Sequence, residues 1–150
     1  CSAYLRDVLG RAGDEAGPPP PVDLAAERRN GECVRSLIGR GLVAACHDLS
    51  DGGLLVAAAE MALASRCGCA LTLADAGAGA LFGEDQGRYL LATGRADEVL
   101  ERARAAGVAA VAVGRTGGDA LTVNGGAPIS LDDLRAAHEG WLPAFADAIA

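Results

Sequence analysis

The chain has 150 residues, of which 51% are hydrophobic and 3% aromatic, and its thirteen arginines and twenty acidic residues leave a net charge of −7. This length predicts one ordinary domain, with a core built from Ala, Leu and Val rather than from large rings. The acidic balance argues against nucleic acid and against an anionic membrane surface as partners. The chain has no lysine, which excludes a P-loop lysine or a Schiff-base lysine within it.

The cysteines and the apolar runs bear on where the protein works. Five cysteines occur without a CxxC pair or the histidine spacing of a zinc site, at Cys1, Cys33, Cys46, Cys67 and Cys69. We expect them to be reduced core residues of a cytoplasmic protein, because no signal peptide or membrane-spanning apolar run is present. The first residue is cysteine rather than methionine, which favours a fragment of a longer protein.

The N-terminal part is predicted to be a short helix followed by a proline-rich spacer. Residues 2–10 suit a helix that ends at Gly10, and four consecutive prolines follow at 18–21. Such a run lacks amide donors and stiffens into polyproline II geometry, so it could dock on a partner surface. We therefore interpret residues 1–30 as a helix plus linking segment packed on residues 31–150, within a single domain overall.

The next predicted helix starts at an aspartate and stops at a glycine. Asp23 is a suitable N-cap, the helix runs through Arg40, and Gly41 follows it. The predicted apolar face consists of Val34, Leu37 and Ile38. A strand is predicted next, over residues 42–47.

This strand leads into a glycine-rich turn and then into a long Ala/Leu helix. Residues 47–62 read HDLSDGGLLVAAAEMA, and the pattern predicts strand, tight turn and a helix from Gly52 or Gly53 to Arg66. The first amide N–H groups of a helix attract anions, and two adjacent glycines would let a ligand approach the backbone closely. The turn is therefore a candidate phosphate site.

Two carboxylates flank the turn. Asp48 and Asp51 lie three residues apart and suit a hard cation such as Mg²⁺, which is usually held jointly with phosphate oxygens. In the alternative interpretation, Ser50 or Asp51 is simply the helix N-cap and the glycines are turn residues. His47 could likewise be a general base, a ligand or a hydrogen-bonded structural histidine. Spacing alone leaves these interpretations open.

A second polar stretch, LFGEDQGR, occupies residues 81–88 just before a predicted strand. Glu84, Asp85 and Gln86 offer carboxylate and carboxamide oxygens there. Arg88 adds a guanidinium fork for a phosphate or a carboxylate. In the alternative interpretation, the stretch is a polar turn in which Arg88 pairs internally with Glu84 or Asp85.

Shorter elements complete the chain. They are a strand at 69–73, a loop at 74–80, a strand at 89–93, a helix at 96–106 ended by Gly107, strands at 108–113 and 120–123, a turn at 124–126 and a last helix from Ser130 or Leu131 past Trp141. We expect Pro143 to kink or split this helix, and Trp141 and Phe145 to plug one edge of the core. The mixed order of helices and strands predicts an α+β fold, a mixed β-sheet flanked by helices.

The sequence resembles the second C-terminal-type domain of the phosphoribosylformylglycinamidine synthases, and the resemblance covers nearly the whole chain. Its motifs are SAYL at 2–5, PPPPVDLAAE at 18–27, HDLSDGGLLVAAAEMA at 47–62, LFGEDQGRYLL at 81–91 and ISLDDLRAAHEGWLPAF at 129–145. The resemblance implies a three-layer α+β fold of the AIR synthase C-terminal kind, with partly ferredoxin-like topology. It also implies a fragment of a small-type synthetase subunit, whose full-length enzyme is an ATP- and glutamine-dependent ligase that converts formylglycinamide ribonucleotide to the amidine in purine biosynthesis.

The resemblance implies a ligand site as well. The nucleotide- or phosphate-binding residues that it implies are Ser50, Gly52, Gly53, Gln86 and Arg88. The metal-binding residues that it implies are Asp48, Asp51 and Glu84. No catalytic residue is expected in the fragment, and the cofactors implied for the full enzyme are ATP or ADP and Mg²⁺. If both stretches serve one pocket, Asp48 or Asp51 should lie near Glu84 or Gln86.

The expected partners are the other domains of the synthetase, a glutaminase subunit and a small bridging subunit. The fragment alone is expected to be inactive, and an exposed apolar surface should let it self-associate. Two alternatives stay open. The domain could be a catalytically silent module that holds nucleotide or binds partners, or it could belong to a selenophosphate synthetase or hydrogenase-maturation relative.

Overall fold

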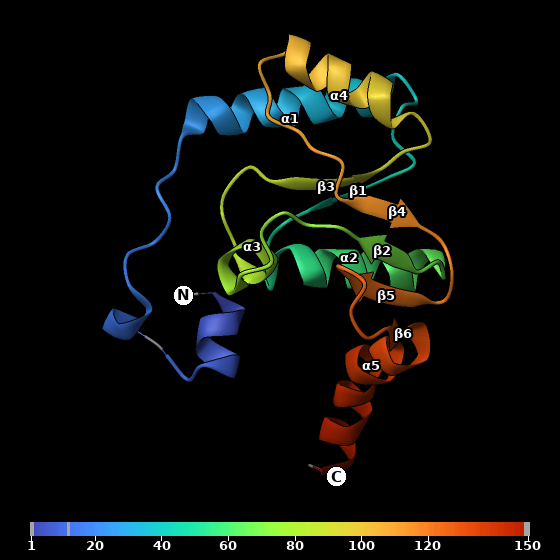
Figure 1. Cartoon of the computed structure of the whole chain (residues 1–150). Coiled ribbons are helices and arrows are strands. Elements are labelled where there is room, and N and C mark those ends of the chain that lie inside the picture. The colour runs from blue at the N-terminus through green and yellow to red at the C-terminus, as the bar shows by residue number, and fades with distance from the viewer. Residues whose placement is uncertain (1, 12, 149–150) are drawn as a thin grey trace. The chain divides into compact units, whose positions relative to one another are not determined.

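A computed structural model describes residues 2–11 and 13–148. In chain order the elements are η1 (Tyr4–Val8), η2 (Gly13–Ala16), α1 (Leu24–Gly39), β1 (Ala45–Asp48), α2 (Gly53–Ser65), β2 (Cys69–Leu71), α3 (Ala78–Phe82), β3 (Tyr89–Ala92), α4 (Ala96–Ala105), β4 (Gly114–Thr116), β5 (Ala120–Val123), β6 (Ile129–Ser130) and α5 (Leu131–Ala148) (Figure 1). The predicted α+β class with a mixed sheet is confirmed.

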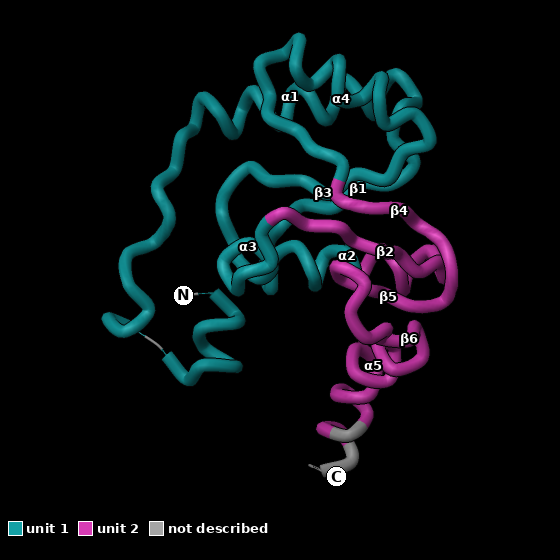
Figure 2. Tube along the Cα trace, viewed as in Figure 1, with its two compact units in different colours: residues 1–58, 75–112 teal, residues 59–74, 113–150 magenta. Residues whose placement is uncertain are grey.

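The chain forms two compact units, which Figure 2 distinguishes by colour. The first unit consists of residues 1–58 and 75–112, and the second of residues 59–74 and 113–150. Neither boundary falls near residue 30, where the sequence suggested the end of a linking segment, and that division stays a prediction.

Helix α1 has the predicted signals at both ends. The Asp23 carboxylate accepts hydrogen bonds from the amides of Ala25 and Ala26, both at 3.0 Å. Gly41, just beyond the last turn, has a φ of +66°, a conformation that favours glycine. Local sequence therefore fixes where this helix begins and ends.

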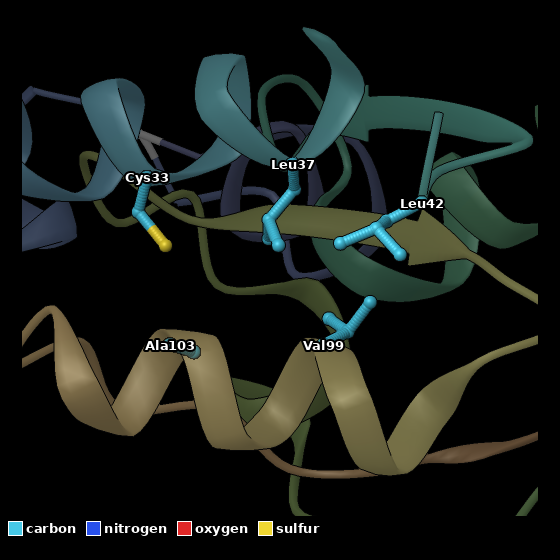
Figure 3. Close-up of a cluster of buried hydrophobic side chains, with 5 residues drawn as sticks. All are labelled: Cys33, Leu37, Leu42, Val99 and Ala103. Atoms are coloured by element: carbon cyan, nitrogen blue, oxygen red, sulfur yellow. The ribbon is translucent and has the colours of Figure 1, made fainter. Parts of the chain in front are cut away.

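The core of the first unit lies where α1 and α4 pack side by side (Figures 1 and 3). Its buried members are Cys33, Leu37, Leu42, Val99 and Ala103. The predicted apolar face of α1 was partly wrong, because Ile38 is 48% exposed and Cys33 is buried in its place. Burial of Cys33 agrees with the expected role of the cysteines, whereas Cys46 is exposed and contradicts it.

Strands β1 and β3 pair antiparallel in the first unit, with Ala45 opposite Ala92 and Asp48 opposite Tyr89. Both strands were predicted, but β1 starts at Ala45 rather than at residue 42. The side chain of Leu42 belongs to the buried cluster of this unit. The ladder sets the end of β1, where the turn at residues 49–53 begins, beside the start of β3, which directly follows the stretch 81–88.

The second unit contains a four-stranded mixed sheet in the order β4-β2-β5-β6. Strand β2 pairs in parallel with β5 and antiparallel with β4, and β5 pairs antiparallel with β6. Position 114 requires glycine, because a Cβ there would collide with the carbonyl of Ala70 on the neighbouring strand. Leu71 and Leu121, at 5% and 3% exposure, are the buried side chains of this sheet.

The strand predicted at 108–113 is wrong. The ladder with β2 is formed by Gly114–Thr116 instead, and Val113 contributes only its carbonyl, to the amide of Thr72. The Val/Ala pattern suits an extended chain, but a strand also needs a partner edge, and β2 has only three residues to offer. Three short elements, η2, α3 and β6, were not predicted.

One expectation for the last helix is also wrong, and a second is wrong in part. Helix α5 continues through Pro143 and is not split there, whereas a kink at Pro143 stays a prediction. Trp141 and Phe145 do not plug the core: they are 66% and 48% exposed, and their rings stack on each other at 5.2 Å between centroids. In the part of the chain that the structure describes, no helix combines the length and apolar character needed to cross a membrane.

Candidate functional site

The turn after β1 is closed by main-chain hydrogen bonds. The amide of Gly53 donates to the carbonyl of Ser50 at 3.0 Å, and the amide of Leu49 donates to the carbonyl of Arg88 at the same distance. The buried side chain of Leu49 anchors the turn. Gly52 and Gly53 have φ values of +80° and +68°, which side chains with a Cβ rarely adopt. We call residues 49–53 the glycine turn.

Packing gives Gly53 a second reason to be glycine. A Cβ at this position would lie 2.7 Å from the carbonyl oxygen of Gly83 and from the carbonyl carbon of Phe82, both main-chain atoms. At Gly52, a Cβ would instead meet the side chain of Val56. The predicted strand, turn and helix are confirmed, and the two glycines are explained by the turn itself.

The carboxylate of Glu84 connects this turn to the second polar stretch. Its Oε1 accepts hydrogen bonds from the amide of Gly52 at 2.8 Å and from the amide of Ala3 at 2.7 Å. Gly52 is buried, so its amide needs an acceptor within the protein. Because Asp51 precedes Gly52, the two stretches lie together, as expected if they serve one pocket.

Arg6 brings positive charge to these carboxylates. Its guanidinium holds the carboxylate of Asp7 at 2.7 and 2.9 Å. This pair is the main reason that the pKa of Arg6 is raised, and Asp51 and Glu84 contribute less. Sequence reasoning offered Arg88 as the cationic neighbour of this site and did not consider Arg6.

Arg88 pairs within its own stretch. Its Nη1 lies 3.4 Å from the carboxylate of Asp85 and 3.5 Å from the carbonyl of Gly83. This contact supports the interpretation in which the arginine has an internal partner. The stretch is held against α1 as well, because the side-chain amide of Asn30 donates to the carbonyl of Gly87 at 3.1 Å.

His47 makes local contacts at the end of β1. Its Nδ1 lies 2.6 Å from the carbonyl oxygen of Asp48 and 3.6 Å from the carboxylate of the same residue. This arrangement fits a structural histidine. The side chain of Asp48 is 65% exposed, so it is free to meet a ligand.

Comparison with protein families assigns the chain to a known family. Residues 5–124 match the family described as AIR synthase related protein, C-terminal domain. The chain belongs to this family. The match covers the glycine turn, the stretch 81–88 and both paired strands of the first unit.

Curated relatives are similar over almost the whole chain. It is 56% identical over 149 residues to the phosphoribosylformylglycinamidine synthase subunit PurL of Caulobacter vibrioides, a match that covers 98% of this chain and 20% of the relative. It is 58% identical over 147 residues to the subunit of the same name from Rhodospirillum rubrum, covering 96% and 20%. The chain therefore spans about a fifth of the length of the curated relatives it matches.

Solved structures agree on the fold of this family member. A T. maritima PurL complexed with FGAR matches with a TM-score of 0.71 at 20% identity, covering 88% of this chain and 24% of that one. The structure of PurLQS from Thermotoga maritima matches with a TM-score of 0.65 at 21% identity, covering 77% and 22%. At these identities the likeness concerns the fold.

The acidic residues of the AIR synthase C-terminal domain do not by themselves form a metal centre here. Within residues 2–11 and 13–148, no three His, Cys, Asp or Glu side chains come together so as to hold a metal ion. A magnesium ion that binds jointly with phosphates needs only one or two carboxylates from the protein. The metal role of Asp48, Asp51 and Glu84 thus stays a prediction.

The amides of the two glycines in the turn already have acceptors in this structure. Gly52 donates to Glu84 and Gly53 donates to the carbonyl of Ser50. The Ser50 hydroxyl, and the exposed Asp51 carboxylate through a cation, are further groups that a phosphate at the turn could contact. The binding roles of Gln86 and Arg88 likewise stay predictions.

Sequence reasoning missed the contribution of residues 2–9, which we call the N-terminal segment. The amide of Ala3 reaches Glu84, and the ring of Tyr4 stacks on Phe82 with centroids 4.6 Å apart and planes 12° apart. Every residue except proline has a main-chain amide, so the sequence does not indicate that the amide of Ala3 is a donor here. Only the presence of two aromatic residues, Tyr4 and Phe82, could have suggested that this segment contacts the stretch 81–88.

Proposed function

We propose that this chain is the C-terminal AIR-synthase-related domain of a PurL-type phosphoribosylformylglycinamidine synthase subunit. The observation that carries the proposal is the identity of 56% to the Caulobacter vibrioides subunit across 98% of the chain. The full-length enzyme uses ATP to activate the amide oxygen of formylglycinamide ribonucleotide, and ammonia from glutamine then displaces phosphate to give the amidine. The proposal includes a role in purine biosynthesis and a cytoplasmic location.

The domain contributes binding residues rather than a catalytic group. Ser50, Gly52, Gly53, Gln86 and Arg88 form the nucleotide- or phosphate-binding set of the proposal. Asp48, Asp51 and Glu84 form its magnesium-binding set, and the cation neutralises phosphate charge. The meeting of the glycine turn with Glu84 supports one shared pocket. Solved relatives in complex with ATP and with ADP support a nucleotide as the ligand.

A chimera tests this function directly. Residues 1–150 replace the matching fifth of the Caulobacter vibrioides subunit, and the purified protein is assayed for amidine formation from formylglycinamide ribonucleotide, ATP and ammonia. We expect activity comparable with that of the parent subunit. A chimera that folds and keeps its partner subunits, yet forms no amidine, would contradict the proposal.

The 150-residue chain alone is expected to form no amidine in the same assay, because it spans only a fifth of its relatives. Turnover by the isolated chain would show that it contains a complete active site.

Asp51→Ala in the chimera tests the pocket. We expect less nucleotide and magnesium to be retained through purification, with a smaller effect on the chemical step, because the carboxylate holds the cation. Glu101→Ala is the matched control, since it removes one exposed carboxylate from α4. Equal nucleotide and magnesium contents in the two variants would leave Asp51 as a turn residue alone.

A second function is favoured by one observation. The groups that would bind phosphate already have partners within the chain: Gly52 with Glu84, and Arg88 with Asp85. Such a site suits a silent module that stabilises its enzyme. Activity retained in an Asp51→Ala chimera that binds no nucleotide at the turn would favour this role.

The proposed partners are the remaining domains of the subunit, a glutaminase subunit and a small bridging subunit. A PurLQS complex among the structural relatives supports an assembly of several subunits. The exposed Trp141 and Leu142 of α5 supply an apolar surface of the kind expected. Self-association of the isolated chain stays a prediction, which sedimentation at several concentrations would check.

A further inference from the structure

Two main-chain amides from distant parts of the sequence share one carboxylate oxygen. Ala3 and Gly52 both donate to Oε1 of Glu84, at 2.7 and 2.8 Å. Hydrogen bonds to a charged acceptor are stronger than those between neutral groups. Gly52 lies directly before α2, so the same carboxylate also sits close to the positive end of a thirteen-residue helix.

The surrounding contacts hold the same three segments together. The ring of Tyr4 stacks on Phe82, two residues before Glu84. Gly53 packs so closely on the main chain of Phe82 and Gly83 that a Cβ would not fit. The N-terminal segment and the glycine turn therefore both rest on residues 82–84, one through a ring and the other through its backbone.

We propose that Glu84 is a positioning residue that fixes the glycine turn and the N-terminal segment to each other through its shared Oε1 atom. In this role it sets the direction of the Gly52 amide and the place of the first residues of the chain. The role requires an acceptor oxygen at this position. It does not require Glu84 to touch a metal ion or a substrate.

Hydrogen exchange on three variants of the 150-residue chain tests the proposal. E84A removes the acceptor, E84Q keeps an oxygen acceptor but no charge, and D85A removes the neighbouring exposed carboxylate as a control. We expect E84A to speed exchange at least about tenfold at Gly52 and in a peptide covering 2–9, since both amides lose their partner. E84Q should speed exchange at these sites by less than about fivefold, because it loses only the attraction between the negative charge and the helix end. D85A should leave the exchange rate at both sites unchanged.

Exchange in α4 reports whether a variant still folds, because α4 belongs to the buried cluster of the first unit. Normal protection in α4 with fast exchange at both sites in E84A, and rescue in E84Q, supports the bridge. Unchanged exchange at Gly52 in E84A, or fast exchange in only one of the two segments, would overturn it.

A measurement without any substitution decides the matter if E84A unfolds. In the wild-type chain, a long-range NMR experiment detects scalar coupling across a hydrogen bond from the amide nitrogen to the acceptor carbon. Couplings from Ala3 and Gly52 to the Glu84 carboxylate carbon support the proposal. Their absence, in a sample where the main-chain bonds of α1 give couplings, would refute it.

A kinetic arm uses the chimera and rests on the proposed function. We expect E84A to raise KM for ATP by about tenfold with a smaller change in kcat, because a displaced turn weakens binding more than chemistry, and E84Q to restore KM. Fast exchange at Gly52 with an unchanged KM would leave the bridge standing and count against a nucleotide at the turn. The two failures are therefore distinguishable.

Discussion

Gly53→Ala should destabilise the first unit strongly. Two effects combine at this residue. An alanine at a φ of +68° costs about 1 kcal/mol or more in backbone strain. The new Cβ would also lie 2.7 Å from the main-chain atoms of Phe82 and Gly83, and forcing such overlap costs about 1–3 kcal/mol. We therefore expect the free energy of unfolding to fall by about 2–4 kcal/mol, measured by urea denaturation with intrinsic fluorescence and circular dichroism.

Gly107→Ala separates the two effects. Gly107 belongs to the same unit and has the same φ of +68°, but nothing lies within 4 Å of the place a Cβ would take. In its alanine variant, the free energy of unfolding should fall only by the cost of backbone strain, about 1 kcal/mol. Equal losses in the two variants would refute the argument that the glycine turn is packed against Phe82 and Gly83.

Three further predictions concern the first unit. Leu37→Ala should lower the free energy of unfolding by about 2–5 kcal/mol, because the side chain is 3% exposed, whereas Ile38→Ala, at 48% exposure, should change it by less than about 1 kcal/mol; equal effects would contradict the assigned core. Asp23→Ala should cost about 1 kcal/mol by loss of the cap, and Asp23→Asn, which keeps an acceptor, should recover most of it in the same assay. Burial raises the pKa of the Cys33 thiol above its ordinary 9.0, so this thiol favours the folded state below that pH and the benefit is lost as pH rises past it. Burial raises the pKa of the Cys46 thiol as well, so access decides the order: alkylation followed by mass spectrometry at about pH 8 should modify the exposed Cys46 well before the buried Cys33, and the reverse order would contradict the burial.

Elements with local signals could be predicted from the sequence. Helix α1 was bounded correctly because Asp23 accepts from the first amides and Gly41 has the positive φ that ends a helix. Strand β5 was predicted at its true bounds because Asn124 and Gly125, both with positive φ, form the turn that stops it. Each of these features depends on a few neighbouring residues.

Features that depend on distant partners could not be predicted in the same way. Residues 108–113 have the composition of a strand, yet β2 pairs with Gly114–Thr116. Trp141 and Phe145 are large and apolar, yet they lie exposed on α5. Composition indicates which secondary structure or burial a segment is suited to, whereas the contacts available in the fold decide whether it forms a strand or is buried.

The candidate site shows both situations at once. The glycine turn and the stretch 81–88 were found from their residues, and the hydrogen bond from Gly52 to Glu84 brings them together. The N-terminal segment was missed because Ala3 contributes only its backbone amide. Arg6 was missed because its nearest partner, Asp7, is also its neighbour in sequence, which resembles an ordinary surface pair.

The hydrogen bonds of the glycine turn restrict how a phosphate could bind there. If a phosphate oxygen accepted a hydrogen bond from the amide of Gly52, it would replace Glu84 as the acceptor. Of the described hydrogen bonds to Oε1 of Glu84, only the one from Ala3 would then be left. Binding at the amide would thus compete with docking of the N-terminal segment. A cation held by the exposed carboxylates of Asp48 and Asp51 avoids this competition, because it reaches the phosphate without using the amide. In the proposed pocket, the carboxylates of Asp48 and Asp51 would therefore hold a cation and its phosphate without breaking a described contact, whereas binding at the Gly52 amide would first require its hydrogen bond to Glu84 to break.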